Sequence, residues 1–226
     1  MICLIAVIMA AGTGSRMKAG RNKVFVPLCG KPMLLYTVEA FEKSRLVNGI
    51  IVVTGENDIN ECIDLLKDCK KLISVIPGGD TRQESSFSGV SAADSEFVLI
   101  HDGARALITP EEIDKVAEAV INTGSGALGV PCVDTMKICK NGKIISTVDR
   151  ENLFKIYTPQ GFNRKKLLEC HIKAKSEGVS VTDDCALYEW AGQAVTAVYG
   201  SSNNIKLTTP EDILMAEAIL KSRENI

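Results

Sequence analysis

The sequence has no excess of positive charge. Its 26 lysines and arginines are balanced by 28 aspartates and glutamates, which gives a formal net charge of −2. A protein that binds a nucleic-acid backbone normally presents a strongly basic face, so this balance argues against nucleic acid as a partner. No apolar run reaches the roughly 18 residues that a membrane-spanning helix needs. We therefore expect neither nucleic-acid binding nor membrane insertion.

Histidine is scarce, and the cysteines form no C-x-x-C pair. The chain has 2 histidines, His101 and His171, and 8 cysteines without the spacing of a zinc site. A chain of 226 residues can bury a core without cross-links. We interpret the cysteines as reduced, buried, small hydrophobic residues and expect a cytoplasmic protein. The opening MICLIAVIMAAG lacks the cationic start of a signal peptide, so a buried strand is favoured there.

Short runs rich in β-branched residues alternate with helical patterns along the chain. We expect strands at 2–9, 49–55, 72–76, 97–103 and 126–135, and helices at 33–44, 58–69, 82–93 and 110–123. Runs that are apolar on both faces indicate a mainly parallel sheet covered by helices. Right-handed crossovers make this a doubly wound α/β fold, and we predict one domain over residues 1–226.

Two helix starts are clear from the sequence. Thr109 and Thr209 each precede a proline and two acidic residues, which is the pattern of a capping residue followed by the first helical turn. Asp183 and Asp184 are interpreted in the same way, as caps of the helix that follows Thr182. We assign these acids to helix ends rather than to catalysis.

Residues 132–149 interrupt the alternation of expected strands and helices. They read as two strands joined at Asn141-Gly142, the strongest short signal for a β-hairpin. A hairpin inserted at this point would project as an arm, and a two-stranded ribbon alone is marginally stable. A second copy of the chain is the obvious surface for it to pack on, although a simple decoration is the alternative.

The loop after the first expected strand, MAAGTGSRMKAGRNK, favours an anion. Met17 stands where a dinucleotide-binding fingerprint needs its third glycine, and Pro32 after Gly30-Lys31 excludes a P-loop. What remains is a glycine turn followed by Arg16 and Lys23, which would suit a triphosphate. The alternative is a tight turn with solvated cations.

Further polar residues follow later expected strands. PGGDTRQES offers a second glycine turn and the hydroxyl of Ser85, although the pair of glycines alone is only a turn. In IHDGAR, Asp102 could hold a metal or a sugar hydroxyl and Arg105 a phosphate, or the two could simply form an ion pair. Lys206 is a cation in a strand-like segment, NNIKLT, near an end of the sheet.

Together these segments resemble the 2-C-methyl-D-erythritol 4-phosphate cytidylyltransferase family. The resemblance rests on AAGTGSRM…NK, GGDTRQES, HDGAR, VDTMK, VDR…TPQGF, TDD and NNIKLTTPED, in this order over nearly the whole chain. The pentitol-phosphate cytidylyltransferases are close relatives of that family and remain the alternative. Four residues depart from the usual family pattern, namely Val24, Ser86, Gly103 and Ala106.

The resemblance implies a Rossmann-like sheet of the nucleotide-diphospho-sugar transferase type and transfer of CMP from CTP to the sugar-alcohol phosphate. It implies catalytic roles for Arg16, Lys23, Arg150 and Lys206. Nucleotide binding would fall to Ala10, Ala11, Gly12, Gly14, Gly79, Asp80 and Ser85. The acceptor would be bound by Asp102, Arg105, Thr135, Arg150 and Thr158.

The resemblance also implies a homodimer through the arm, with Thr135 and Arg150 reaching the partner's site. Mg²⁺ is expected, held largely by phosphates and water rather than by protein ligands. Two functions of other kinds stay open: a nucleotide-binding regulatory module without turnover, and an NAD-dependent oxidoreductase, which the missing third glycine disfavours.

Overall fold

A seven-stranded sheet organises the chain. The computed structural model describes residues 2–12 and 22–224. The strands lie in the order β11-β7-β10-β6-β1-β4-β5. Their bounds are β1 (Leu4–Ala10), β4 (Gly49–Thr54), β5 (Leu72–Pro77), β6 (Phe97–Asp102), β7 (Ser125–Pro131), β10 (Phe154–Asn163) and β11 (Ala197–Tyr199).

The sheet is mainly parallel, as the sequence predicts. Strand β1 pairs in parallel with β4 and β6, β4 with β5, and β11 with β7. Strand β10 runs antiparallel to both β6 and β7, and its register shifts between Ile156 and Gln160. Neither β10 nor β11 was expected. The chain leaves β1 toward β4 on one side and returns to β6 on the other, which is where open α/β sheets bind ligands.

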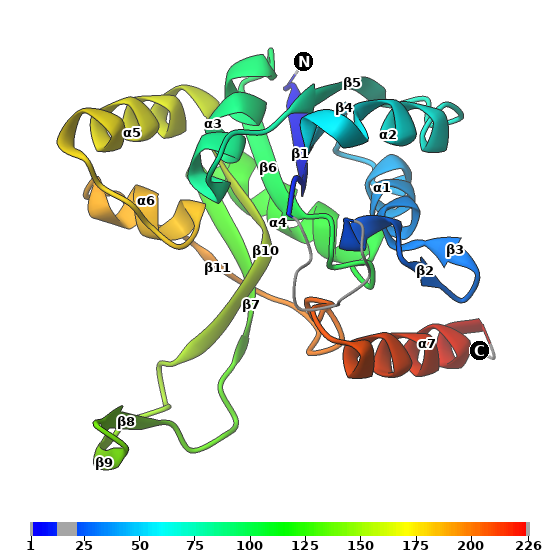
Figure 1. Ribbon diagram of the computed structural model, residues 1–226. Coiled ribbons are helices and arrows are strands. Elements are labelled where there is room, and N and C mark those ends of the chain that lie inside the picture. The colour runs from blue at the N-terminus through cyan, green and yellow to red at the C-terminus, as the bar shows by residue number, and fades with distance from the viewer. Residues whose placement is uncertain (1, 13–21, 225–226) are drawn as a thin grey trace.

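Helices cover both faces of the sheet (Figure 1). One face packs against α3 (Arg82–Ala92), α5 (Arg164–Glu177) and α6 (Asp184–Trp190), and the other against α1 (Met33–Lys43), α2 (Ile59–Leu65) and α4 (Pro110–Thr123). The alternating side chains of β1 explain how one strand serves both layers. Leu4, Ala6 and Ile8 join one core cluster, whereas Ile5 and Val7 join the other.

A third, smaller core lies at the carboxyl edge of the sheet. Helix α7 (Pro210–Glu224) packs near the short strands β2 (Pro27–Leu28) and β3 (Lys31–Pro32) and the loop after β6. Leu28, Leu107 and Ala216 are buried in this cluster. Helix α7 therefore closes the side of the sheet edge on which Lys206 lies.

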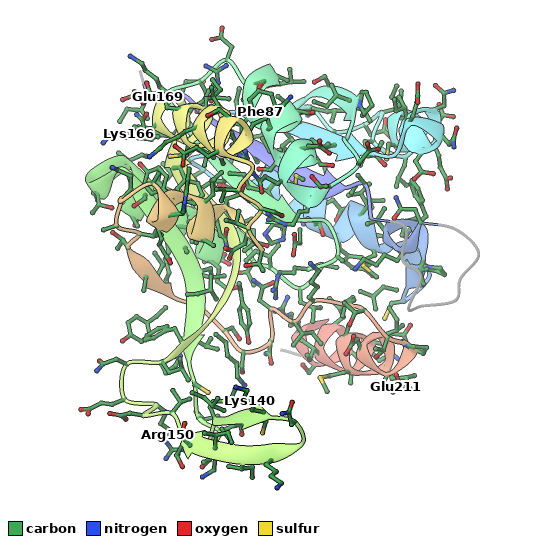
Figure 2. The ribbon with its side chains drawn as sticks, turned by 60° about the vertical axis from the view of Figure 1, so that its left-hand side comes forward. Phe87, Lys140, Arg150, Lys166, Glu169 and Glu211 are labelled. Atoms are coloured by element: carbon green, nitrogen blue, oxygen red, sulfur yellow. The ribbon has the colours of Figure 1, made fainter. Side chains whose placement is uncertain are left out.

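The arm is a hairpin that projects from the body, as predicted (Figure 1). Strands β8 (Lys137–Lys140) and β9 (Lys143–Thr147) meet at Asn141 and Gly142, whose φ angles of 50° and 74° match a tight primed turn. Figure 2 shows Lys140 and Arg150 on this arm, away from the sheet. Apolar side chains remain exposed there, Ile144 at 66% and Ile145 at 62%.

All three helix starts agree with the sequence, although Asp184 has a second role. Thr109 caps α4 with a reciprocal capping box to Glu112, and the backbone N–H of Asp212 points to the Thr209 hydroxyl at 3.4 Å. Asp183 caps α6, and Asp184 lies in the first turn of that helix, where its side chain is buried in the interior. No helix within residues 2–12 and 22–224 is long and apolar enough to cross a membrane.

Candidate functional site

A cavity of about 410 Å³ opens at the carboxyl ends of β1, β5 and β6. This volume lies in the range of sites for small molecules. Eight of the residues that the sequence singled out line it together: Ala11, Gly12, Lys23, Gly79, Asp80, Ser85, Asp102 and Lys206. They come from five separate segments of the chain, which the parallel sheet gathers at one edge.

Lys23 is held at the cavity by Asn22. The Asn22 amide donates to the carbonyl of Ala10 at 2.6 Å and to Oδ2 of Asp58 at 2.9 Å. The Asn22 side-chain oxygen accepts from the N–H of Val24, and this hydrogen bond caps the short 3-10 helix η2 (Lys23–Phe25). Lys23 Nζ donates to the carbonyl of Leu207 at 3.3 Å. Asn22 thus anchors this lysine to the end of β1.

The second glycine turn is shaped by Ser85. The Ser85 hydroxyl accepts from the N–H of Gly79 at 3.1 Å and lies 3.3 Å from the Gly79 carbonyl. A Cβ on Gly78 would lie 2.6 Å from that hydroxyl, and one on Gly79 would lie 2.4 Å from Cβ of Glu84. Thr81 and Glu84 form a capping box at the start of α3. Glycine is therefore required for the backbone to come this close to the helix.

Asp102 lies among three cations at the end of β6. Its Oδ2 is 2.7 Å from Lys206 Nζ and 3.9 Å from Arg105 Nε, and its Oδ1 is 3.7 Å from Arg82 Nε. Burial works to raise the pKa of Asp102, but the charges of Lys206, Arg82 and Arg105 outweigh it and lower the pKa to about 2. The carboxylate is therefore ionised at neutral pH.

Arg82 lines the same cavity and was given no role from the sequence. Its Nη1 donates to Oδ2 of Asp184 at 2.8 Å, and Asp184 also accepts from the Ser86 hydroxyl at 2.5 Å. Burial works to lower the pKa of Arg82, but Asp184 and Asp102 raise it overall, so the guanidinium stays charged. Asp184 is thus a buried counter-ion behind the cavity wall.

Three predicted residues support the cavity from behind rather than lining it. Ala10 is buried and its carbonyl accepts from Asn22. Arg105 donates from Nη1 to the carbonyl of Asn204 at 2.8 Å and stacks over the Tyr157 ring at 4.7 Å. The Thr158 hydroxyl, in the irregular part of β10, accepts from the N–H of Asp102 at 3.0 Å.

Lys206 does not lie in a strand, which corrects the expectation for this segment. Residues 204–208 are irregular, and the buried Asn204 fixes them by donating from Nδ2 to the carbonyl of Thr158 at 2.9 Å. The segment therefore follows β10 and the loop after β6 instead of pairing with a strand.

The remaining predicted residues lie elsewhere. Thr135 and Arg150 are exposed at the arm and do not line the cavity of their own chain; Arg150 donates from Nη1 to the carbonyl of Val133. Gly14 and Arg16 lie outside the described residues.

A mainly parallel sheet flanked by helices, with a cavity lined by cations at its carboxyl edge, is the arrangement expected of a nucleotidyltransferase of the Rossmann-like class. The sequence profile of the 2-C-methyl-D-erythritol 4-phosphate cytidylyltransferase family matches residues 4–222. The chain belongs to this family.

Similar proteins agree with this membership. The 2-C-methyl-D-erythritol 4-phosphate cytidylyltransferase of Halalkalibacterium halodurans is 42% identical over 221 residues, covering 96% of this chain and 97% of the relative. That of Desulforamulus reducens is 42% identical over 226 residues, with 97% of each chain covered. The crystal structure of 4-diphosphocytidyl-2C-methyl-D-erythritol synthase from Anaerococcus prevotii matches with a TM-score of 0.88 and 30% identity, covering 97% of this chain and 96% of that one.

Proposed function

We propose that the chain transfers the cytidylyl group of CTP to 2-C-methyl-D-erythritol 4-phosphate and releases pyrophosphate. The observation that supports this function most is that Lys23, Arg82 and Lys206 line one cavity together with the backbone turn at Gly79 and Asp80. Both substrates are anions, so fixed cations remove the main obstacle to their meeting.

The nucleotide would occupy the side formed by the two glycine turns. Ala11 and Gly12 would contact the nucleotide just after the end of β1, and Gly79, Asp80 and Ser85 would recognise cytosine, mainly through backbone groups. Gly14 would line the same loop. Lys23 would bind the triphosphate together with Arg16. These assignments rest on the shared cavity for all but Gly14 and Arg16, and on the family's motif for those two.

The chemical step would be an in-line displacement at the α-phosphorus. A phosphate oxygen of the acceptor attacks that atom, the new P–O bond forms, and the bond to pyrophosphate breaks as pyrophosphate leaves. Lys206 would stabilise the charge that spreads over the oxygens of the α-phosphorus. Asp102 would accept hydrogen bonds from hydroxyls of the acceptor, and Arg105, with Thr158 beside it, would hold the loop that faces the acceptor. Positioning and charge neutralisation supply most of the acceleration in reactions of this type.

A divalent metal, Mg²⁺ in our proposal, fits the cavity only as an ion carried by the phosphates. Within the described residues no three His, Cys, Asp or Glu side chains gather as a ligand set, and Asp102 is already neutralised by its three cations. Mg²⁺ keeps much of its water and suits such a site. When bound, it would offset charge on the leaving pyrophosphate.

The arm would complete the site of a second subunit. The exposed apolar side chains of the arm include Val133, at 73%, and Ile144, at 66%. A two-stranded ribbon by itself has no second layer that could bury them. Thr135 and Arg150 lie on or beside this arm, so a homodimer that packs it would bring them to the partner's acceptor. The eight unpaired cysteines suit the reducing cytoplasm that we propose as the location.

Pyrophosphate release tests the function. We expect release from CTP with 2-C-methyl-D-erythritol 4-phosphate and much slower release with ribitol 5-phosphate, which would be the better acceptor for a pentitol-phosphate enzyme. The Lys206→Ala variant is the control for contaminating activity. Absence of release with either acceptor would leave only a nucleotide-binding module and would refute the proposal.

A further inference from the structure

His101 is the penultimate residue of β6, directly before Asp102, and its imidazole has no solvent exposure. Its Nδ1 lies 3.1 Å from the Thr158 hydroxyl, and its Nε2 lies 3.3 Å from the carbonyl oxygen of Arg105. The ring also packs against Phe41 at 5.0 Å between centroids. His101 therefore joins β6, the loop after it and β10 at one point.

These contacts select one arrangement of protons. A carbonyl oxygen can only accept, so the hydrogen bond to Arg105 requires a proton on Nε2. Nδ1 of the neutral ring then carries a lone pair and accepts from the Thr158 hydroxyl. That hydroxyl in turn accepts from the N–H of Asp102 at 3.0 Å. In this arrangement every donor and acceptor in the hydrogen-bonded series has a partner, from the N–H of Asp102 through the Thr158 hydroxyl and the His101 ring to the Arg105 carbonyl.

The two other states of the ring leave a conflict. With the proton on Nδ1, the lone pair of Nε2 would face the lone pairs of the Arg105 carbonyl in a fully buried place, which is costly. A doubly protonated ring would place a charge in the interior. Burial lowers the pKa of His101 to about 3, because it outweighs the nearby charge of Asp102 and the backbone hydrogen bonds, which raise the pKa, and the charge of Arg105 adds to the lowering. The ring is therefore neutral at neutral pH.

We propose that His101 is a positioning residue for acceptor binding, as a neutral imidazole with its proton on Nε2. It holds the turn that carries Asp102 and Arg105, and it takes up the single proton of the Thr158 hydroxyl. The Thr158 hydroxyl is thereby left as the acceptor for the N–H of Asp102, and it acts on the acceptor site through the position of Asp102. The identity of the acceptor rests on the proposed function, whereas the state of the ring does not.

The first experiment measures the protonation state of the His101 ring directly by NMR. The chain has 2 histidines, so ¹⁵N-histidine labelling gives two ring spectra, and the His171→Gln variant assigns them. We expect the two-bond pattern of an Nε2–H ring for His101, unchanged from about pH 5 to 8, the range in which ordinary histidines titrate. An Nδ1–H pattern, or titration within that range, would overturn the proposal.

The second experiment separates the two hydrogen bonds of the ring. Asparagine places its oxygen near the position of Nδ1 and can keep the bond to Thr158, whereas glutamine reaches the position of Nε2 and can keep the bond to Arg105. We expect His101→Asn and His101→Gln each to raise the KM for the acceptor by roughly tenfold, the effect of losing about one buried hydrogen bond. The KM for CTP should stay within about twofold, because the nucleotide side of the cavity is built from other segments.

Adding Thr158→Val tests whether the ring acts through that hydroxyl. The added change should raise the acceptor KM as much in His101→Asn as in the wild type, and by less in His101→Gln, where the bond is already lost. Equal additional effects in both backgrounds would contradict the proposal, as would wild-type acceptor KM values in both single variants.

Ser44→Ala serves as the control for general destabilisation. Ser44 is buried and donates to Asp114 at 2.6 Å, in the turn that precedes β4, so its loss should lower stability and leave both KM values unchanged. If the wild-type chain released no pyrophosphate while the ring spectrum was as expected, the proposed function alone would fail.

Discussion

Lys206 Nζ lies 2.7 Å from Oδ2 of Asp102, although the two residues belong to segments far apart in the chain. The pair lies in the cavity wall, with Arg82 and Arg105 as further cations near the same carboxylate. An acceptor hydroxyl that binds Asp102 therefore meets a carboxylate that is already fixed in place. The phosphates of both substrates would meet a cavity in which Lys23, Arg82 and Lys206 outnumber Asp80 and Asp102.

Replacement of Asp102 should separate acceptor binding from nucleotide binding. In Asp102→Asn, Lys206 and Arg105 lose their counter-ion and Arg82 keeps Asp184 alone, so the cavity becomes more positive and the affinity for CTP should stay equal or rise. The acceptor loses a charged hydrogen-bond partner, and kcat/KM for it should fall on the order of a hundredfold. Steady-state kinetics and calorimetric titration with CTP measure the two effects. A parallel loss of CTP affinity would show that Asp102 serves the nucleotide instead.

The low pKa of Asp102 also predicts a pH dependence of stability. The pKa is about 2 in the folded chain and about 4 in an unfolded one, so the carboxylate stabilises the fold above about pH 4 by about 2.5 kcal/mol. This contribution is lost as the pH falls from about 4 toward 2. Urea unfolding at a series of pH values should show the wild type losing more stability over this window than Asp102→Asn. A constant difference between the two would refute the shift.

Turnover should depend on both lysines of the cavity. Lys23→Ala and Lys206→Ala should each lower kcat on the order of a hundredfold or more, because each removes a positive charge from the cavity that would bind the phosphates. Lys31→Ala is the matched control: this lysine pairs with Glu39 at 2.5 Å and is similarly half-buried, but it does not line the cavity. Near-normal turnover of Lys23→Ala would remove Lys23 from the mechanism.

The sequence predicted the cavity because parallel strands bring their carboxyl ends to one edge. Ala11, Gly79 and Asp102 each follow or end a strand whose β-branched pattern is clear, so their meeting could be inferred without knowing the path of the helices. The hairpin was predictable for a similarly local reason, since Asn141-Gly142 alone sets its turn.

Other parts of the site depend on contacts that leave no local pattern. Strand β10 was missed because its apolar pattern is interrupted by Tyr157-Thr158-Pro159, where the register shifts. Lys206 was expected in a strand because its neighbours alternate, yet the side chain of Asn204 pins the segment to β10 instead. Asp184 resembled a helix cap next to Asp183, and only the fold shows that it neutralises Arg82.

The half-buried Arg82 and the buried Asp184 should be coupled. Asp184→Asn leaves the guanidinium with the longer contact to Asp102 at 3.7 Å as its nearest carboxylate, and the loss of a hydrogen bond between charged groups costs about 1.5–3 kcal/mol. Arg82→Met should be costly for the converse reason. The double variant should be less destabilised than the sum of the two, as urea unfolding can measure. Additive costs would mean that the two charges are stabilised independently.

If the arms of a homodimer complete each other's active sites, mixing two inactive variants should restore activity. In a homodimer whose arms cross, a mixed dimer of an Arg150→Ala chain and a Lys206→Ala chain has one site with both residues intact and one with neither. When the two are refolded together in equal amounts, half the dimers are mixed, so about a quarter of the wild-type activity should return. Lys23→Ala mixed with Lys206→Ala is the control, since both lysines lie in the cavity of one chain and no intact site can form. No recovery in the test mixture would show that each chain completes its own site, whereas recovery in the control would show that Lys23 and Lys206 do not serve the same site.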